Sequence, residues 1–433
     1  MPEFRCFDPS EVVRGIQQLL ASDKKKIAFL FGAGTSLAKK TEDSPSIPAI
    51  GKMTELVVEH LVTDADYGKK YEIALTEIKE ELEQQGQSLI IETLLTNVEE
   101  KIRVIGKGTL NNLNKEEFIT VRNKIHEKIQ EVICIHKGLM GKEKTLIQYD
   151  FAKWIVNADR KFGVEIFTTN YDYLFEVGLE ANNVPYYDGF TGSYKPFFNA
   201  DSLEDMNYLP KQTKLWKIHG SLGLHMDTYG RIQRMSSDHA GLLIYPSSLK
   251  YNHSKKQPYS AFMDRLNLFL KQHDAVLFVC GYSFGDEHIN ERILSALQTD
   301  TTAHVFILNY DTVWEKDEDG NNVKTHSFSE DSIIGKLASR NRKISVLATR
   351  SAVKGGLFGD WKIRPDIDLN GTLVPAAYFR EDVAYTTDQK TGDQTGVQIK
   401  MGKGELLLPD FVSFVELLKS MIPKSEWESK DGE

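Results

Sequence analysis

The chain has 433 residues, 41% of them hydrophobic and 27% charged, and its 53 basic and 62 acidic side chains give a formal net charge of −9. This composition excludes a disordered chain, the length allows about two or three domains or one large domain with insertions, and the acidic balance argues against direct nucleic-acid binding. Three cysteines, none close to another in sequence, exclude a disulfide framework and a zinc module of paired cysteines. Without an export signal or a run of about 18 apolar residues, we expect a cytoplasmic protein with no membrane partner.

The chain opens with a predicted helical segment, residues 1–24, and then alternates apolar runs with helical patterns. The runs are short and nearly free of charge, which is typical of strands buried on both faces of a sheet. Strand, turn and helix in repetition predict the α/β class, with a Rossmann-like parallel sheet and helices on both faces. The predicted strands are residues 27–31, 164–168, 215–218, 275–280, 304–308 and 344–347.

More than a hundred residues separate the first two predicted strands, which is too many for one crossover. Apolar side chains in this gap recur at intervals of three or four, as on one face of a helix. They are Phe118, Val121, Ile125, Ile129 and Val132. We therefore predict a helical insertion at about 52–145, after the first strand of a domain that spans 25–312.

Beyond residue 312 the sequence changes character, and we predict an α+β C-terminal extension over 313–433. Glycine-containing turns punctuate short alternating stretches, which predicts hairpins, and a final amphipathic helix uses Phe411 and Phe414. This extension is a candidate surface for an oligomer or a partner. The turns are expected at 319–321, 354–356, 370–371, 391–393 and 402–404.

A glycine-rich loop containing Gly32, Ala33, Gly34 and Ser36 follows the first predicted strand directly. Glycines at a strand–helix junction let the backbone approach a phosphate, and the N-terminus of the next helix favours negative charge. A tight turn of any α/β fold is the alternative interpretation. A dehydrogenase is disfavoured, because Leu37 stands where the dinucleotide fingerprint requires glycine or alanine.

Polar residues also follow the next predicted strands. Because ligands bind outside the carboxyl ends of strands in open α/β sheets, we expect these residues to converge at one edge. An amide can hold a ribose hydroxyl or a water, and a histidine is a general-base candidate, although helix capping and a structural histidine remain alternatives. The residues are Thr169, Asn170 and Asp172 after the second strand, His219 after the third, Gly281 and Ser283 after the fourth, and Asn309 at the end of the fifth.

In this order, the motifs resemble those of the sirtuin (silent information regulator) superfamily. Residues 32–36 resemble its Gly-Ala-Gly-x-Ser loop, 168–172 its Thr-Gln-Asn-x-Asp with threonine replacing glutamine, and 219–220 its His-Gly pair. Residues 281–290 are especially similar to a segment of the bacterial sirtuin-like branch found in antiphage defence. The resemblance covers about 25–312. Two departures, the missing four-cysteine zinc ribbon after His219 and Ala49-Ile50-Gly51 in place of Pro-Asp-Phe-Arg, argue against an acyl-lysine channel.

The resemblance implies a role for each motif in binding NAD. It implies that Asn170 and Asp172 hold the nicotinamide ribose, that Thr169 stands beside them in the cofactor-binding set, and that His219 is the catalytic base. It also implies that the remaining motif residues contact the rest of the dinucleotide. These are Gly32, Ala33, Gly34 and Ser36 at the pyrophosphate, Gly281 and Ser283 at the phosphates, and Asn309 at the adenosine ribose.

These expectations together predict an NAD hydrolase that uses NAD as its substrate, needs no zinc, and employs Asn170 and His219 as catalytic residues. The resemblance further implies an effector of antiphage abortive infection that depletes NAD. It would form a homo-oligomer and be gated by a partner, such as a HerA-type hexameric DNA-translocase ATPase or another defence protein. The main alternative is a non-enzymatic subunit that senses NAD or ADP-ribose. A protein deacylase or ADP-ribosyltransferase is a further, less favoured alternative.

Overall fold

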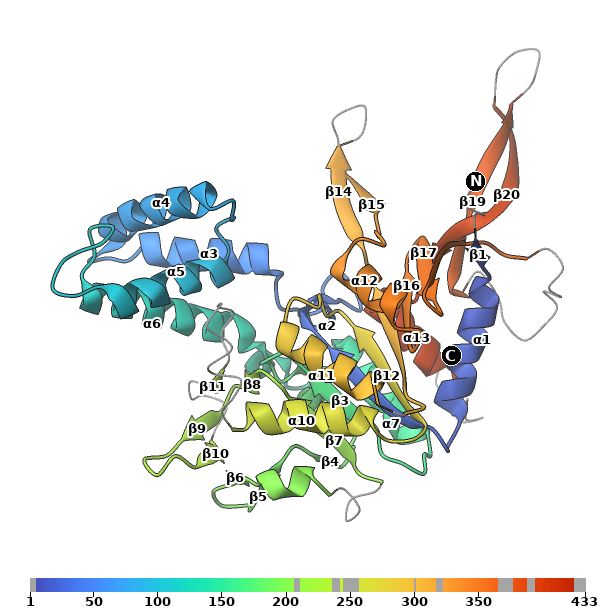
Figure 1. Ribbon diagram of the computed structural model, residues 1–433, viewed down its shortest axis with the longest axis horizontal. Helices are drawn as coiled ribbons and strands as arrows, with labels where there is room; N and C mark the ends of the chain where they lie inside the picture. Colours follow the sequence, from blue (N-terminus) through green and yellow to red (C-terminus); the bar gives the residue numbers. More distant parts are fainter. Residues whose placement is uncertain are drawn as a thin grey trace.

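The computed structural model describes residues 5–205, 211–235, 242–243, 257–299, 301–316, 322–364, 377–387 and 394–423. All six strands that the apolar runs predicted are confirmed, and they lie side by side in one sheet (Figure 1). They are β2 (Lys26–Phe31), β3 (Glu165–Thr168), β7 (Thr213–Lys217), β12 (Ala275–Cys280), β13 (His304–Asn309) and β16 (Ile344–Ala348). Four further strands complete the ten-stranded sheet, namely β1 (Cys6–Phe7), β4 (Tyr186–Tyr187), β17 (Ser351–Lys354) and β18 (Leu357–Trp361).

The order of the six strands is that of a doubly wound sheet. Across the sheet they run β16, β13, β12, β2, β3, β7, and each neighbouring pair is parallel. The chain thus winds outward from β2 in one direction through β3 and β7, then returns to β12 and winds in the other direction. The Rossmann-like prediction is confirmed, and the winding reverses between β2 and β12, where such sheets bind ligands.

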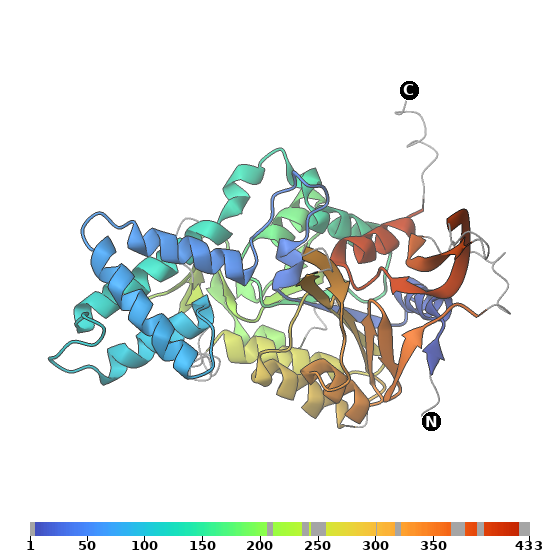
Figure 2. The same ribbon diagram turned by 90° about the horizontal axis from the view of Figure 1, so that it is seen from above.

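Helices cover both faces of the sheet, because successive side chains of each strand point to opposite faces. On β2, Phe29 and Phe31 enter one core and Ala28 and Leu30 the other. Figure 2 shows the yellow α10 and α11 on one side of the sheet and the red α13 on the other. The first face carries α1 (Pro9–Ala21), α7 (Ile147–Asn157), α8 (Leu174–Ala181) and α13 (Phe411–Ser420), and the second carries α10 (Tyr259–Leu270), α11 (Glu287–Leu297) and α12 (Ile333–Arg340).

Four helices between β2 and β3 form a bundle beside the sheet (Figure 1). Their buried side chains form a separate core that includes Phe118, Val121, Ile125 and Ile129. Val132 is only half-buried, and the neighbouring Ile133 is buried in another cluster. A capping box starts the last helix, in which Asn114 and Glu117 each accept a hydrogen bond from the other's main-chain nitrogen. The helices are α3 (Ile50–Val62), α4 (Gly68–Gln84), α5 (Ile91–Val104) and α6 (Lys115–Ile133).

The helical bundle contains a histidine that makes its stability depend on pH. Burial, together with the nearby Arg122, lowers the pKa of His126 to about 4, from the 6.5 of an unfolded chain. Between pH 6.5 and 4 the unfolded chain therefore binds the proton more readily, so stability is lost as the pH falls. We expect acidification from pH 7 to 5 to cost up to about 2 kcal/mol through this group, and His126→Gln to remove that part of the loss.

Thermal unfolding of the wild type and His126→Gln at the two pH values measures this effect. The exposed His225, replaced by glutamine, serves as the control and should keep the wild-type pH dependence. If the wild type and His126→Gln lost equal stability between pH 7 and 5, His126 would not contribute to the pH dependence.

In the described part of the C-terminal extension, four pairs of consecutive strands are antiparallel, among them β14 (Thr312–Lys316) with β15 (Asn322–His326) and β19 (Phe379–Thr387) with β20 (Gln394–Leu406). The turn predicted at 354–356 is confirmed: Gly355 and Gly356 join β17 to β18 with φ values of 60° and 82°. The turn predicted at 402–404 is wrong, because these residues lie inside β20. There the register shifts at a bulge and Gly402 has a φ of 71°, so the glycine serves the bulge. The turns expected at 319–321, 370–371 and 391–393 lie outside the described residues.

This extension continues the sheet across the predicted boundary at residue 312. Strand β16 pairs with β13, and α13 places Phe414 against Phe29 and Phe278, with ring centroids 6.2 and 5.9 Å apart. The predicted domain limits remain predictions, whereas the sheet and its core are shared by residues on both sides of the boundary. Within the described ranges, every helix is too short or too polar to cross a membrane.

Candidate functional site

Two glycine-containing loops meet at the carboxyl ends of β2 and β12. Gly32 donates its main-chain N–H to the oxygen of Cys280, and Gly34 donates to the oxygen of Gly281, both at 3.0 Å. Gly281 has a φ of 65°, and a Cβ there would lie 2.7 Å from the main-chain nitrogen of Thr35. A Cβ on Gly34 would lie 2.7 Å from the Cα of Gly281. Glycine is therefore required on both sides, and this close approach lies at the point where the strand order reverses.

Asn170, after β3, locks the first glycine loop in place. It is 6% exposed, and its Nδ2 donates to the oxygen of Gly32 at 3.0 Å, to Thr35 Oγ1 at 3.1 Å and to Ser36 Oγ at 2.7 Å. Both amide hydrogens are thus used within the protein, which leaves the carbonyl Oδ1 as the atom that can act on a bound molecule. The predicted convergence of the first and second strand ends is realised in these contacts.

Asp172 continues this network to the start of α8. Its Oδ2 accepts a hydrogen bond from Ser36 Oγ at 2.7 Å, and its Oδ1 accepts one from the main-chain nitrogen of Leu174 at 3.0 Å. The carboxylate therefore satisfies a main-chain N–H at the start of α8, as the capping interpretation expected, and also fixes Ser36; its contact with a ribose stays a prediction. Gln148, from α7, adds a bond from its Nε2 to the oxygen of Thr35 at 2.7 Å.

Lys217, the last residue of β7, holds the main chain of residues 171–172 in place. Its Nζ donates to the main-chain oxygens of Tyr171, at 3.2 Å, and Asp172, and to Glu176 Oε1 at 2.8 Å. Burial raises the pKa of the Glu176 carboxyl, and the positive charge of Lys217 opposes that shift. Sequence reasoning missed Lys217, although a lysine at the end of an otherwise apolar strand was a visible signal.

His219 lies just beyond β7 and is paired with Asp286. The ring Nε2 is 3.0 Å from Asp286 Oδ2, and both side chains are buried. The other oxygen of Asp286 accepts hydrogen bonds from the main-chain nitrogens of His288, at 3.0 Å, and Ile289, at 3.5 Å, at the start of α11. A carboxylate in this position orients the imidazole.

The His219–Asp286 contact also defines how the loop after β12 runs. Strands β12 and β7 are three positions apart in the sheet, or about 14 Å at the usual spacing of strands. For Asp286 to reach His219, the loop that begins at Gly281 must cross the carboxyl edge above β2 and β3. The loop therefore encloses the same edge that holds Gly32 and Asn170.

The other predicted residues are placed at this edge with fewer contacts. Thr169 ties the end of β3 to β2 by donating its main-chain N–H to the oxygen of Phe31 at 3.0 Å, and Ala33 is exposed in α2 (Ala33–Leu37). Ser283 is exposed and accepts a hydrogen bond from the main-chain nitrogen of Gly285 at 3.4 Å. Asn309 ends β13, one strand beyond β12. Across the described ranges, neither Ser283 nor Asn309 shares a hydrogen bond with Asn170 or Asp172.

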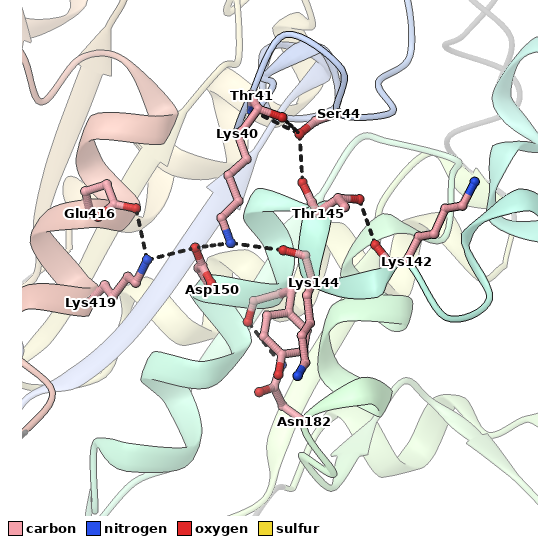
Figure 3. Close-up of polar contacts among 11 residues, drawn as sticks. Lys40, Thr41, Ser44, Lys142, Lys144, Thr145, Asp150, Asn182, Glu416 and Lys419 are labelled. Atoms are coloured by element: carbon pink, nitrogen blue, oxygen red, sulfur yellow. Dashed lines mark hydrogen bonds and ion pairs between the residues drawn. The ribbon is translucent and has the colours of Figure 1, made fainter. Parts of the chain in front are cut away.

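A second polar cluster fixes the segment that leaves the glycine loop for the helical bundle (Figure 3). The buried Asp150 of α7 pairs with Lys40 at 2.8 Å and with Lys419 of α13 at 3.3 Å. Lys40 also donates to the main-chain oxygen of Lys144, at 3.0 Å, and Ser44 Oγ donates to that of Thr145, at 2.9 Å. Residues 40–44 are thereby held against α7 and α13, which anchors the loop from its far end.

Among the residues that the structure describes, no group of three or more histidine, cysteine, aspartate or glutamate side chains is arranged to hold a metal ion. All three cysteines lie in the described ranges and are free: Cys6 is exposed, Cys134 half-buried and Cys280 buried.

Comparison with known proteins agrees with the geometry of this edge. Residues 164–331 match the family model of the SIR2-like domain, and a search of curated proteins found no match. The matched stretch includes Asn170, His219 and Asp286, whereas the first glycine loop precedes it. Residues 164–331 are therefore similar to a SIR2-like domain, and domains of this kind are NAD-dependent enzymes.

Proposed function

We propose that the protein is an NAD hydrolase, which cleaves the bond between nicotinamide and ribose with water. The products are nicotinamide, ADP-ribose and a proton. One observation carries the proposal: the Asn170 network and the His219–Asp286 pair lie at the same strand edge, beneath a loop that encloses it. This arrangement combines a polar group for a ribose with a general base.

The proposed binding mode follows the edge from β3 to β13. Asn170, Thr169 and Asp172 face the nicotinamide ribose, and the glycine loop that contains Gly32, Ala33, Gly34 and Ser36 faces the pyrophosphate. The crossing loop brings Gly281 and Ser283 to the phosphates, and Asn309 is assigned to the adenosine ribose. The contact between Gly34 and Gly281 supports this assignment, because the main chains of their two loops meet where the strand order reverses, between β2 and β12.

Cleavage in this mode depends on a good leaving group. Nicotinamide is cationic when bound to ribose and leaves as a neutral molecule, so the transition state resembles an oxocarbenium ion and needs little acid catalysis. Asn170 Oδ1 accepts a hydrogen bond from a ribose hydroxyl or from the attacking water. His219 takes the proton of that hydroxyl or water, and Asp286 stabilises the imidazolium that forms.

Incubation of the purified protein with NAD tests this function, with nicotinamide and ADP-ribose measured by chromatography. We expect turnover by the wild type, and an approximately 100-fold or greater loss in Asn170→Ala, because its oxygen is removed and its loop is released. Asn123→Ala, which removes an exposed asparagine of α6, is the matched control and should keep full activity.

Two results would contradict the proposal. Undiminished turnover in Asn170→Ala would refute the role of that residue, provided that the variant unfolds at a temperature close to that of the wild type. No NAD loss with the wild type, even with a partner or an infection trigger, would refute the hydrolase. Thermal stabilisation by ADP-ribose without NAD loss would instead favour the sensor.

We also propose the biological setting that the resemblance implies. In it the protein is a cytoplasmic effector of antiphage abortive infection, acts as a homo-oligomer, and depletes NAD once a partner such as a HerA-type ATPase releases its activity. A fall in cellular NAD after phage infection, absent in cells that carry His219→Ala, is the expected outcome. An unchanged NAD level in infected wild-type cells would argue against this setting.

A further inference from the structure

A cavity of about 390 Å³ lies between α1 and the sheet, on the face opposite α10 and α11. Its floor is formed by β13 and β16, and its side by α1. On β13, Val305 and Ile307 are buried on the other face of the sheet, whereas His304 and Phe306 are only half-buried on this one. The inner strand β13 is thus only partly covered on the face of the sheet that α1 packs against.

The cavity is separate from the site at the strand edge. His304 is the first residue of β13 and Asn309 the last, so about 16 Å of strand lies between them. The cavity lies over one face of β13 and β16, whereas Gly32, Asn170 and His219 follow the carboxyl ends of β2, β3 and β7.

Gly15 leaves room in the wall of the cavity. Apart from proline, glycine is the least favourable residue in a helix, yet Gly15 lies in the middle of α1. In α8 the comparable Gly178 is needed for packing, because a Cβ there would lie 2.6 Å from the main-chain oxygen of Gln148. At Gly15 a Cβ would meet nothing within 4 Å, so close packing does not require glycine, which instead leaves the cavity open.

The walls offer flat rings and apolar side chains, with positive charges among them. The rings of His304 and Phe306 have centroids 4.6 Å apart, and His304 Nε2 lies 2.9 Å from Ser345 Oγ. Burial lowers the pKa of His304 to about 4, so this ring is neutral near pH 7. Of the charged side chains that line the cavity, Arg342 and Lys354 are basic and Glu11 is acidic.

We propose that this cavity binds a small molecule that has a planar aromatic ring system and one anionic group. The rings would lie on Phe306 and His304, opposite Gly15, and the anion would be held by Arg342 and Lys354. The volume is within the usual range of small-molecule sites, about 300–1,000 Å³, and such sites combine apolar walls with a few polar groups that orient the ligand.

The experiment uses two probes with the same rings, the anionic 8-anilinonaphthalene-1-sulfonate and the uncharged N-phenyl-1-naphthylamine. We expect the anionic probe to bind saturably, with an increase in fluorescence, and Gly15→Leu to weaken its binding at least tenfold by filling the cavity. Gln18→Leu adds the same side chain at an exposed position of α1 that does not line the cavity, and it should bind as the wild type does.

A double variant, Arg342→Gln with Lys354→Gln, tests the charge without filling the space. It should weaken the anionic probe about five- to tenfold and leave the uncharged probe within twofold. Equal binding of the anionic probe to the wild type and Gly15→Leu would overturn the site, and an unchanged affinity in the double variant would overturn the class of ligand. Asn170→Ala should not affect either probe, so the result is independent of the proposed NAD hydrolysis.

Discussion

Replacement of His219 by alanine is expected to lower NAD turnover by about 10²- to 10⁴-fold, the range in which a general base contributes. The structure pairs this imidazole with the buried carboxylate of Asp286 at the strand edge. His225→Ala, at an exposed position, is the control and should retain full turnover. Steady-state kinetics with NAD measures the effect, and a His219→Ala variant as fast as the wild type would show that another group takes the proton.

Substitution of Asp286 tests the role of His219 more specifically, because the two carboxylate oxygens of Asp286 have different partners. One accepts from the main chain at the start of α11 and the other faces His219. Asparagine caps helices about as well as aspartate, so Asp286→Asn should keep the unfolding temperature and lower kcat by about tenfold, with little change in KM. Asp286→Ala loses the cap as well and should cost about 1 kcal/mol of stability. If Asp286 were only a cap, Asp286→Asn would leave kcat unchanged.

The largest effect on stability is expected from Gly281→Ala. Its φ of 65° is unfavourable for alanine, and the added Cβ would lie 2.7 Å from the nitrogen of Thr35 and 2.9 Å from the Cα of Gly34. Neither neighbour is a flexible side chain, so one of the two loops must move. We expect a loss of about 3 kcal/mol in the free energy of unfolding, and the loss of stabilisation by NAD.

Gly285→Ala is the matched control in the same loop. A Cβ there would meet only Ser283 Oγ, at 3.4 Å, and no left-handed φ is required. It should change the free energy of unfolding by less than about 1 kcal/mol. Chemical unfolding with and without NAD compares the two variants, and similar losses in both would mean that the close approach of Gly281 to Gly34 is not needed.

The sequence predicted where the strands of the sheet lie in the chain but not which strands are adjacent in the sheet. Continuous apolar runs reveal burial on both faces, which is why β2, β12 and β13 were found with nearly correct limits. Strand order depends on contacts between distant residues, such as Phe29 with Phe278, and has no local pattern. The two-residue β1 is too short to carry any period. At Gly402 the sequence signal was present but ambiguous, because a turn and a β-bulge both use the left-handed backbone conformation that glycine adopts easily.

At the site, the sequence identified the strand edge and several of its side chains, but not how they are held. Asn170 and His219 were found because polar residues there follow buried strands. The partner of His219 is 67 residues away, and the need for the loop after β12 to cross the edge is visible only in three dimensions. Gln148 was missed for a related reason, since it acts on a main-chain oxygen that any sequence could supply, whereas the charge of Lys217 at the end of an apolar strand was a signal that was not used.

The position of α13 has a consequence for how the protein is made. Phe414 covers Phe29 and Phe278, yet the ribosome releases Phe29 early and Phe414 only after nearly the whole sheet has been synthesised. Until then α7 and α8 can cover part of the aromatic face of β2, through Phe151 and Phe175, but the part that Phe414 covers stays open. Contacts between such distant segments form slowly, and chains with exposed apolar strands tend to aggregate. This core can therefore close completely only after α13 has been synthesised.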